Sequence, residues 1–463
     1  MKKNDPIATS RRTLLKAGAG FLGASLLGGL PFRSFAQAAA LKPADRCFVF
    51  VYFSGGWDQL LAFDPRDPDV FTPERVAETR ILPGYNLFTD GTAPFPITPA
   101  GSNITFGPAV ANLAKHYGRM AVVRGVNMTT LAHEEGMRYF ITGKRPIGAA
   151  ARGSSTATEI VGQMVPTVPI PSIAYGVESY NDRYPGSANA LRVSRSKDLV
   201  DTLSPSTRKL DSQIETELLA LGGEPVTCDE AALSAGGVGD SYHTSRDQVL
   251  QVLKGGLSEK FNFAKASTDP AKDPNKPVRD FYGLADSGPY DNAAGRAALV
   301  ATALKLGISQ CVSINLVGGL DTHFGTQTTH LGNLRTGFNA LSLLVDDLAR
   351  TPHPSGGDFM DHTTILVFSE FARTPLINAT NGRDHHLTNS CLLMGAGVKH
   401  NMVFGHSGDI AMAAGLVDLK TGAKDSNNGE SILPDHIIAT VLASAGLDYS
   451  ITRVEPLKPL LAT

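Results

Sequence analysis

Carboxylates and histidines gather in four short segments of this sequence, three of which directly follow a run of apolar residues. The seven candidate ligands in these segments are Asp58, Asp321, His323, Glu370, Asp384, His385 and His386. Carboxylate oxygen and imidazole nitrogen suit zinc, manganese or iron(II). Taken alone, Asp58 is typical of a turn residue after two glycines, and His323 of a loop or helix-capping histidine. Their grouping favours one shared polar site, and the residue types alone leave open whether that site holds a divalent metal.

The apolar runs beside these residues predict strands of a parallel sheet. Cys47–Phe53, Met120–Val123, Cys311–Val317, Thr363–Phe368 and Ser390–Met394 lack the alternation of a half-exposed strand. Continuous apolar strands are what a parallel sheet covered on both faces requires. In such folds ligands bind beyond the carboxyl ends of the strands. The candidate ligands are therefore expected at one edge of the sheet.

Amphipathic segments between the runs predict helices. Apolar residues recur at spacings of four and three from Leu334 to Leu348, on one face of a helix that ends near Arg350. Residues 435–445 are predicted to form a final helix, stopped by a glycine. Alternating strands and helices indicate a three-layer α/β/α sandwich with a mostly parallel sheet. The polar stretch 194–287 has few strand candidates and is predicted to be a helical insertion beside that sheet.

The first 38 residues predict export by the twin-arginine route. Arg11 and Arg12 precede a 14-residue apolar stretch, and Ala36-Gln37-Ala38 supplies the small residues of a cleavage site. The apolar stretch is shorter than the roughly 20 residues that span a bilayer. Residues 39–463 are therefore expected to form one periplasmic or secreted α/β domain without a stable membrane span.

Composition and charge exclude two classes of protein. Hydrophobic residues make up 42% of the chain and charged residues 19%, which is not the composition of a disordered protein. The net charge is −2, and it becomes −7 when residues 1–38 take six basic residues and one acidic residue with them. No basic surface for a nucleic-acid partner is therefore expected.

Four sequence blocks resemble a known family. The blocks are FSGGWDQ (Phe53–Gln59), GGLDTH (Gly318–His323), FSEFARTP (Phe368–Pro375) and NGRDHH (Asn381–His386). They resemble the Tat-exported family called domain of unknown function 1501 and, more distantly, the alkaline phosphatase and sulfatase superfamily. The resemblance implies an alkaline phosphatase-like fold and one or two divalent metals. It also implies a small anionic phosphate or sulfate ester as the substrate.

The sequence departs from that superfamily in its ligands and its nucleophile, and the usual spacing of four in the carboxylate–histidine pair is two here, from Asp321 to His323. Its aspartate–histidine pair after a later strand falls here on Ser369-Glu370, so Glu370 would replace the aspartate, and the neighbouring histidine is missing. Sulfatases and nucleotide pyrophosphatases place their nucleophile nine residues before a Thr-Gly pair. Counting back from Thr142 reaches His133, which is not Ser, Thr or Cys. The resemblance therefore leaves His133 as a metal ligand, a base or a nucleophile, or leaves the attack to a metal-bound water.

Three functions from different classes follow. The first is an exported metal-dependent hydrolase in which Arg373 and Arg383 fork onto the oxygens of the anion. For these two residues the alternative is that they are ordinary surface arginines. The second is a non-catalytic periplasmic binding or assembly protein, with a protein partner, on a degenerate hydrolase fold. The third is an iron(II) redox or oxygen-using enzyme.

Overall fold

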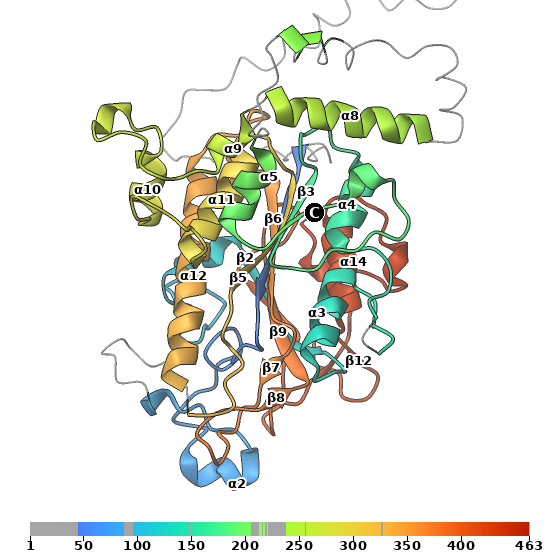
Figure 1. Cartoon of the computed structure of the whole chain (residues 1–463). Helices are drawn as coiled ribbons and strands as arrows, with labels where there is room; N and C mark the ends of the chain where they lie inside the picture. Colours follow the sequence, from blue (N-terminus) through green and yellow to red (C-terminus); the bar gives the residue numbers. More distant parts are fainter. Residues whose placement is uncertain are drawn as a thin grey trace, which may run out of the picture. The chain divides into compact units, whose positions relative to one another are not determined.

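An eight-stranded, mostly parallel sheet forms the centre of the computed structural model (Figure 1). The structure describes residues 45–462, apart from 88–95, 149, 205–212, 215, 218–219, 221–237, 255 and 326. The predicted export signal, residues 1–38, lies outside the described residues.

The central sheet has the strand order β10-β2-β9-β6-β1-β5-β3-β4. In that order the strands are β10 (Met402–Phe404), β2 (Met120–Asn127), β9 (Thr388–Gly395), β6 (Thr363–Phe368), β1 (Cys47–Phe53), β5 (Cys311–Val317), β3 (Ser172–Tyr175) and β4 (Leu191–Val193). All neighbours pair in parallel except β9, which is antiparallel to both β2 and β6. The expectation that the Ser390–Met394 run would be a parallel strand is therefore wrong, because an apolar strand buried on both faces has the same pattern in either direction.

Two small sheets accompany the large one. They are the pair β7 (Ala372–Arg373) with β8 (His385–His386), and the pair β11 (Leu416–Val417) with β12 (Glu430–Ser431). The first pair binds the segment after β6 to the segment before β9. It therefore holds two of the predicted ligand segments against each other.

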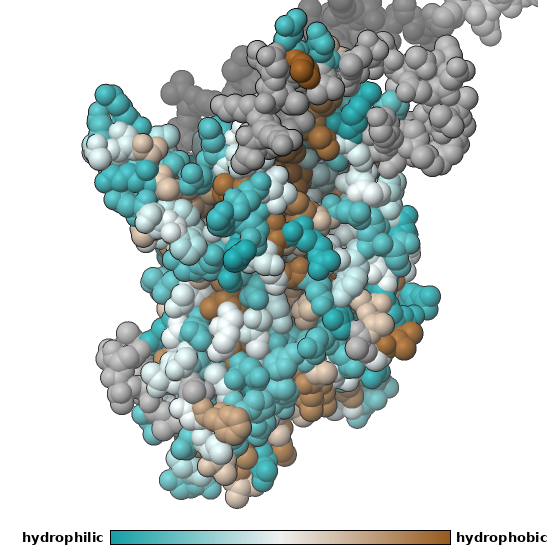
Figure 2. Space-filling model, viewed as in Figure 1, coloured by the Kyte–Doolittle hydropathy of each residue, from teal (hydrophilic) through white to brown (hydrophobic). Residues whose placement is uncertain are grey.

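Helices cover both faces of the sheet, which confirms the predicted three-layer α/β/α architecture. One layer contains η4 (Ala111–Arg119), α11 (Ala293–Lys305) and α12 (Gln327–Arg350), and the other contains α3 (His133–Thr142), α4 (Thr156–Met164) and α14 (Pro434–Ser444). The residues of β1 alternate between two hydrophobic clusters. Val49, Val51 and Phe53 pack with the first layer, whereas Phe48 and Phe50 pack with the second. On the face seen in Figure 2, apolar surface appears as a band between the two helical layers.

The predicted helices agree closely with the observed ones. The helix expected to end near Arg350 is α12, and the helix expected at 435–445 is α14. The described part of the stretch 194–287 contains α5 (Ser196–Leu203), α8 (Val238–Lys254), α9 (Leu257–Lys260), η6 (Pro270–Lys272) and α10 (Lys276–Tyr282). That this stretch is an insertion stays a prediction.

Short elements complete the fold. They are η2 (Pro73–Arg75), α2 (Val76–Thr79), η3 (Tyr85–Leu87), η5 (Gly186–Ala188), α13 (Phe359–His362), η7 (Ser450–Thr452) and η8 (Lys458–Leu460). Among the described residues, no helix is both long and apolar enough to cross a membrane.

The topology brings five chain segments to one edge of the sheet. Strands β1, β5 and β6 are neighbours and parallel, so the segments that follow them start side by side. Strand β2 runs in the same direction as β6, because both are antiparallel to β9. Strand β9 begins where the others end, so β8, which precedes it, lies at this edge too.

Candidate metal centre

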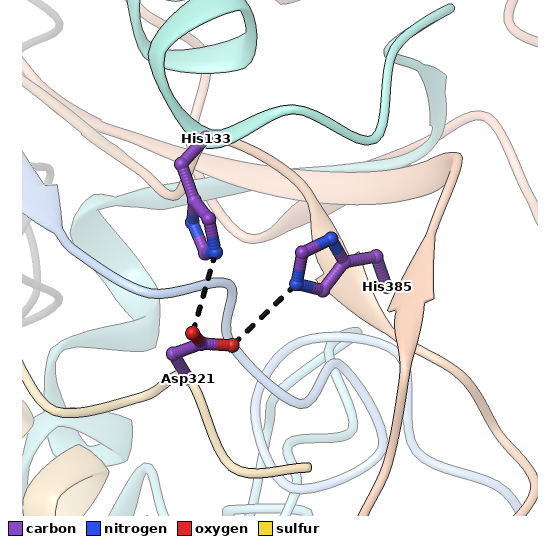
Figure 3. A group of neighbouring side chains, drawn as sticks. All are labelled: His133, Asp321 and His385. Carbon is purple, nitrogen blue, oxygen red and sulfur yellow. Dashed lines mark hydrogen bonds and ion pairs between the residues drawn. The ribbon is translucent and has the colours of Figure 1, made fainter.

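His133, Asp321 and His385 turn their side chains toward one another at this edge (Figure 3). One ligand atom from each lies within 4.8 Å of the others. His133 Nε2 is 3.6 Å from Asp321 Oδ2, and His385 Nε2 is 3.5 Å from Asp321 Oδ1. The three residues come from the first turn of α3, the segment after β5, and β8. Residues far apart in the sequence therefore form one group.

His323 extends this group to four candidate ligands. Its Nε2 lies 3.0 Å from His385 Nε2 and 3.1 Å from Asp321 Oδ1. Four ligands about 2.0–2.1 Å from a tetrahedral ion are about 3.3–3.4 Å apart. The spacings among His323, His385 and Asp321 are therefore close to those of ligands around one tetrahedral ion.

In each of the three histidines Nε2 faces Asp321, and a hydrogen bond made by Nδ1 assigns the tautomer. His133 Nδ1 donates to Glu370 Oε1 at 2.7 Å, and His323 Nδ1 donates to Asp384 Oδ1 at 2.8 Å. In its neutral form each ring therefore keeps the Nε2 lone pair on the side of Asp321.

His385 follows the same pattern with a backbone acceptor. Its Nδ1 donates to the carbonyl oxygen of Leu131 at 2.7 Å. Metal-binding histidines usually donate their second N–H to a carboxylate or a carbonyl, which fixes the ring and raises its basicity. All three histidines have such a partner. The Nε2 atoms of His323 and His385 face each other as two acceptors, an arrangement that a cation between them would stabilise.

The charge of the group also fits a divalent cation. Asp321, Glu370 and Asp384 supply three carboxylates, and Arg373, which contacts Asp321, supplies one guanidinium. With neutral imidazoles, the group carries two negative charges in excess. The side chain of Asp321 is 52% exposed, so the centre is open to solvent. An open position is what separates a catalytic metal site from a closed structural one.

Arg373 holds Asp321 in place from the buried side of the centre. Its side chain is fully buried, and Nη2 donates to Asp321 Oδ1 at 2.5 Å. Nη1 donates to the carbonyl oxygen of Arg383 and, at 3.3 Å, to His323 Nε2. The remaining bonds go to the carbonyl oxygens of Gly55 and Gly56. The prediction that Arg373 forks onto a substrate anion is therefore wrong, because its N–H groups already have acceptors.

The pKa values in the group follow from these contacts. The hydrogen bond to Glu370 raises the pKa of His133. Burial lowers the pKa of His385, so this ring favours its neutral form. Burial pushes the pKa of Asp321 upward, but the hydrogen bond and charge of Arg373 outweigh it, and the pKa is lowered. Neutral His385 and ionised Asp321 are the forms that bind metals.

Two glycines allow the segments to approach this closely. Gly55 has φ +112°, and a Cβ at that position would lie 2.5 Å from the backbone nitrogen of Asp321. A Cβ at Gly136 in α3 would lie 2.2 Å from the carbonyl oxygen of Glu370. Any larger residue would separate β1 from β5, or α3 from β6, and would move His133 and Asp321 apart.

Glu370 and Asp384 support histidines instead of pointing at the centre. Glu370 is buried, Oε1 also accepts from the Gly55 N–H at 2.7 Å, and Oε2 lies 2.9 Å from Ser369 Oγ. Asp384 Oδ1 accepts from His323 and from Asn378 Nδ2. Both were predicted to be metal ligands. The structure makes them the partners of His133 and His323, because each binds the Nδ1 side of a histidine ring.

Asp58 and Arg383 form a separate buried ion pair. Arg383 Nε lies 2.8 Å from Asp58 Oδ2, at an angle too bent for a hydrogen bond. Asp58 Oδ1 accepts from the backbone N–H groups of Leu60 and Leu61, which makes Asp58 the turn residue of the alternative interpretation. Arg383 also donates to the carbonyl oxygens of Thr374, Leu82 and Pro83. Neither residue therefore performs its predicted role as metal ligand or anion clamp.

His386 points away from the group that His385 joins. Successive side chains of a strand lie on opposite sides, and these two residues form β8. His386 Nδ1 accepts from the N–H of Thr388 at 3.2 Å. The prediction of His386 as a ligand is therefore wrong, and the dipeptide supplies one histidine to the centre.

Two supporting groups were missed by the sequence reasoning. The Leu131 carbonyl that orients His385 is a backbone atom, for which a sequence carries no signal. His330 in α12 is buried, accepts from the Asp58 N–H at 2.9 Å and lies 2.8 Å from Thr322 Oγ1. Burial lowers its pKa to about 3, so it stays neutral. The sequence offers one hint, a histidine four residues before the apolar helix face begins at Leu334.

Comparison with solved structures gives similarity at low identity. Ps i-CgsB, in complex with k-i-k-neocarrahexaose, is 8% identical, with 89% of this chain and 75% of that chain covered and a TM-score of 0.39. Alkaline phosphatase from the Antarctic bacterium TAB5 is 10% identical, with 88% and 99% covered and a TM-score of 0.33. TM-scores this low leave the site to be judged on its own geometry. No curated protein sequence matches the chain.

A family model matches the part of the chain that carries most of the centre. The family is described as protein of unknown function (DUF1501), and its model matches residues 259–452. Asp321, His323 and His385 lie inside this range, together with three of the four sequence blocks. His133 and the FSGGWDQ block lie outside it. Over residues 259–452 the chain is therefore similar to the family that its blocks resemble.

Proposed function

We propose that the protein is an exported metal-dependent hydrolase of phosphate or sulfate esters. The observation that carries the proposal is the convergence of three imidazole Nε2 atoms on the carboxylate of Asp321. Each imidazole is fixed from behind by an acceptor, and the whole group has an excess of negative charge. An anionic ester would be repelled by such a site unless a cation were bound there.

The residues divide into ligands and supports. His133, Asp321, His323 and His385 are the ligands in this proposal. A bound zinc, manganese or iron(II) ion would polarise an ester oxygen and stabilise the charge that develops on it. Glu370, Asp384 and the Leu131 carbonyl hold the three rings, and Arg373 holds the carboxylate. The 52% exposure of Asp321 leaves room for substrate on the solvent side.

Water is the nucleophile in this proposal. The position predicted for a nucleophile falls on His133, whose Nδ1 is bound to Glu370 and whose Nε2 faces Asp321. The cysteines of the described part, Cys47, Cys311 and Cys391, are buried in the central sheet and cannot reach a substrate. The nearby Thr130 hydroxyl donates to Glu135 at 2.8 Å.

The N-terminus of helix α3 adds an electrostatic field that favours anions at the candidate metal centre. Among the described residues, no side chain caps its N-terminus, and His133 is its first residue. The free N–H groups of a first helical turn carry a partial positive charge that favours anions. Glu134 and Glu135 in that turn oppose this effect, so the helix alone would not select an anion.

The test is a panel of phosphatase, phosphodiesterase and sulfatase substrates with each metal in turn. Hydrolysis of one ester class that requires a metal and disappears in Asp321→Asn supports the proposal. Tight metal binding without turnover of any ester would contradict the hydrolase and leave the binding or assembly protein.

Fractionation of cells that produce the full chain tests export. Export predicts that the mature protein is found outside the cytoplasm and begins near residue 39.

A further inference from the structure

A basic cleft of about 540 Å³ lies at the opposite end of α3 from the candidate metal centre. His133 is the first residue of α3 and Gly143 is its C-cap, so about 15 Å of helix separates the two places. The charged residues that line the cleft are Lys144, Arg145, Arg152, Asp182, Asp435 and Arg453. They come from the segments after α3 and after β3, from the start of α14 and from the end of η7.

Three arginines in this cleft have no charged partner. Within the described part of the chain, Arg145, Arg152 and Arg453 form neither a salt bridge nor a side-chain hydrogen bond, and all three are exposed. Three unpaired guanidinium groups around one cavity provide positive charge that no ion pair neutralises. Each guanidinium also offers paired N–H donors whose spacing matches the oxygens of phosphate and sulfate.

The other charged residues of the cleft are already engaged. Lys144 Nζ lies 3.9 Å from the buried carboxylate of Glu159. Asp182 Oδ1 accepts from the Ser154 hydroxyl at 2.7 Å. Burial raises the pKa of Asp435, the second carboxyl group of the cleft, so three unpaired arginines face two carboxyl groups. The cleft therefore keeps a net positive charge after its internal partners are counted.

The backbone at Arg453 adds an independent sign of constraint. Arg453 has φ +61°, in the left-handed region that residues other than glycine seldom occupy. Such conformations persist only where the surrounding structure imposes them, and they collect at ligand sites. Here the conformation ends η7 and directs the chain past the cleft.

We infer that this cleft binds a small organic molecule through a phosphate or sulfate group. A cavity of about 540 Å³ is in the range of small-molecule sites, about 300–1,000 Å³, and is larger than a bare oxyanion needs. The inference is independent of the proposed function, because it uses neither the metal centre nor its ligands. A ligand there would contact the C-terminal end of α3 and the start of α14.

The test is isothermal titration calorimetry on chelator-treated mature protein at constant ionic strength. Glucose 6-phosphate and glucose 6-sulfate are the probes, glucose is the neutral control, and inorganic phosphate separates a free ion from a carried group. Removing metals with a chelator prevents the anions from binding at the other site. Saturable binding of a charged sugar, tighter than that of inorganic phosphate, is expected.

Single substitutions then locate the binding. Arg152→Gln and Arg453→Gln should each weaken binding about tenfold, the cost of one charge-assisted hydrogen bond. Arg80→Gln is the matched control, because Arg80 is exposed and also has a positive φ, +58°. The inference is overturned if glucose binds as tightly as the charged sugars, or if the charged sugars bind no more tightly than inorganic phosphate. It is also overturned if their binding does not saturate by about 10 mM, or if both variants keep the wild-type affinity.

Discussion

Replacing Glu370 by Gln should weaken metal binding while leaving the fold almost unchanged. In the structure Glu370 Oε1 accepts from His133 Nδ1 and from the Gly55 N–H. A glutamine oxygen can accept both bonds, and its amide can donate to Ser369 Oγ. The Ser369 hydroxyl keeps the Phe53 carbonyl as an acceptor at 2.7 Å. The substitution therefore removes the negative charge and keeps the hydrogen bonds to His133, Gly55 and Ser369.

The expected loss is about 10- to 100-fold in metal affinity, which is the usual effect of removing the partner of a metal-binding histidine. This corresponds to about 1.4–2.8 kcal/mol. The assay is calorimetric titration of zinc or manganese into chelator-treated protein. Glu159→Gln is a matched control, because Glu159 is equally buried but lies beside Tyr184 and Lys144, away from the centre.

The same variant changes the titration of His133. Glu370 raises the pKa of His133, so folding stabilises the imidazolium of the metal-free protein. That contribution is fully present below the unfolded pKa of about 6.5 and is lost as the pH rises through the folded value. The stability difference between wild type and Glu370→Gln should therefore shrink with rising pH, and NMR should find a lower pKa for His133 in the variant. Unchanged affinity and an unchanged pKa would refute the role given to Glu370.

Two further predictions separate the centre from its surroundings. His385→Ala should reduce metal affinity at least about 100-fold, whereas His386→Ala should leave it within about twofold; equal effects in titration would contradict the opposite directions of the two rings. Asp58→Asn should lower the free energy of unfolding by about 3–5 kcal/mol, because it leaves Arg383 buried without its charge partner. Denaturant unfolding measures this, with Asp201→Asn in an exposed pair as a control expected below about 1 kcal/mol. A loss of similar size in the control would contradict the role of burial.

The layers of the fold could be predicted because burial on both faces leaves a direct mark on the sequence. β1, β5 and β6 have the predicted bounds, since each is an uninterrupted apolar run between polar residues. The direction of β9 could not be predicted in the same way. Direction depends on which neighbours a strand pairs with, and an apolar run contains no information about that.

The sequence predicted where the residues of the site lie, but not which of them are ligands and which support a ligand. Asp321, His323 and His385 were placed correctly at one edge, because the ends of adjacent strands must meet there. Whether a carboxylate points at the centre or at the back of a histidine depends on side-chain direction and on partners such as the Gly55 N–H. Glu370 therefore had the right place and the wrong role. His386 failed for a simpler reason, because neighbouring residues of a strand cannot face the same side.

The most direct measurement is metal titration of the chelator-treated mature protein beside Asp321→Asn. Within the described ranges, Asp321 is the one carboxylate that the histidines His133, His323 and His385 share. The account predicts about one equivalent of zinc or manganese for the wild type. It predicts a higher melting temperature on binding, and loss of both effects in the variant. No saturable binding in the wild type, or equal binding in Asp321→Asn, would contradict a metal centre at this edge of the sheet.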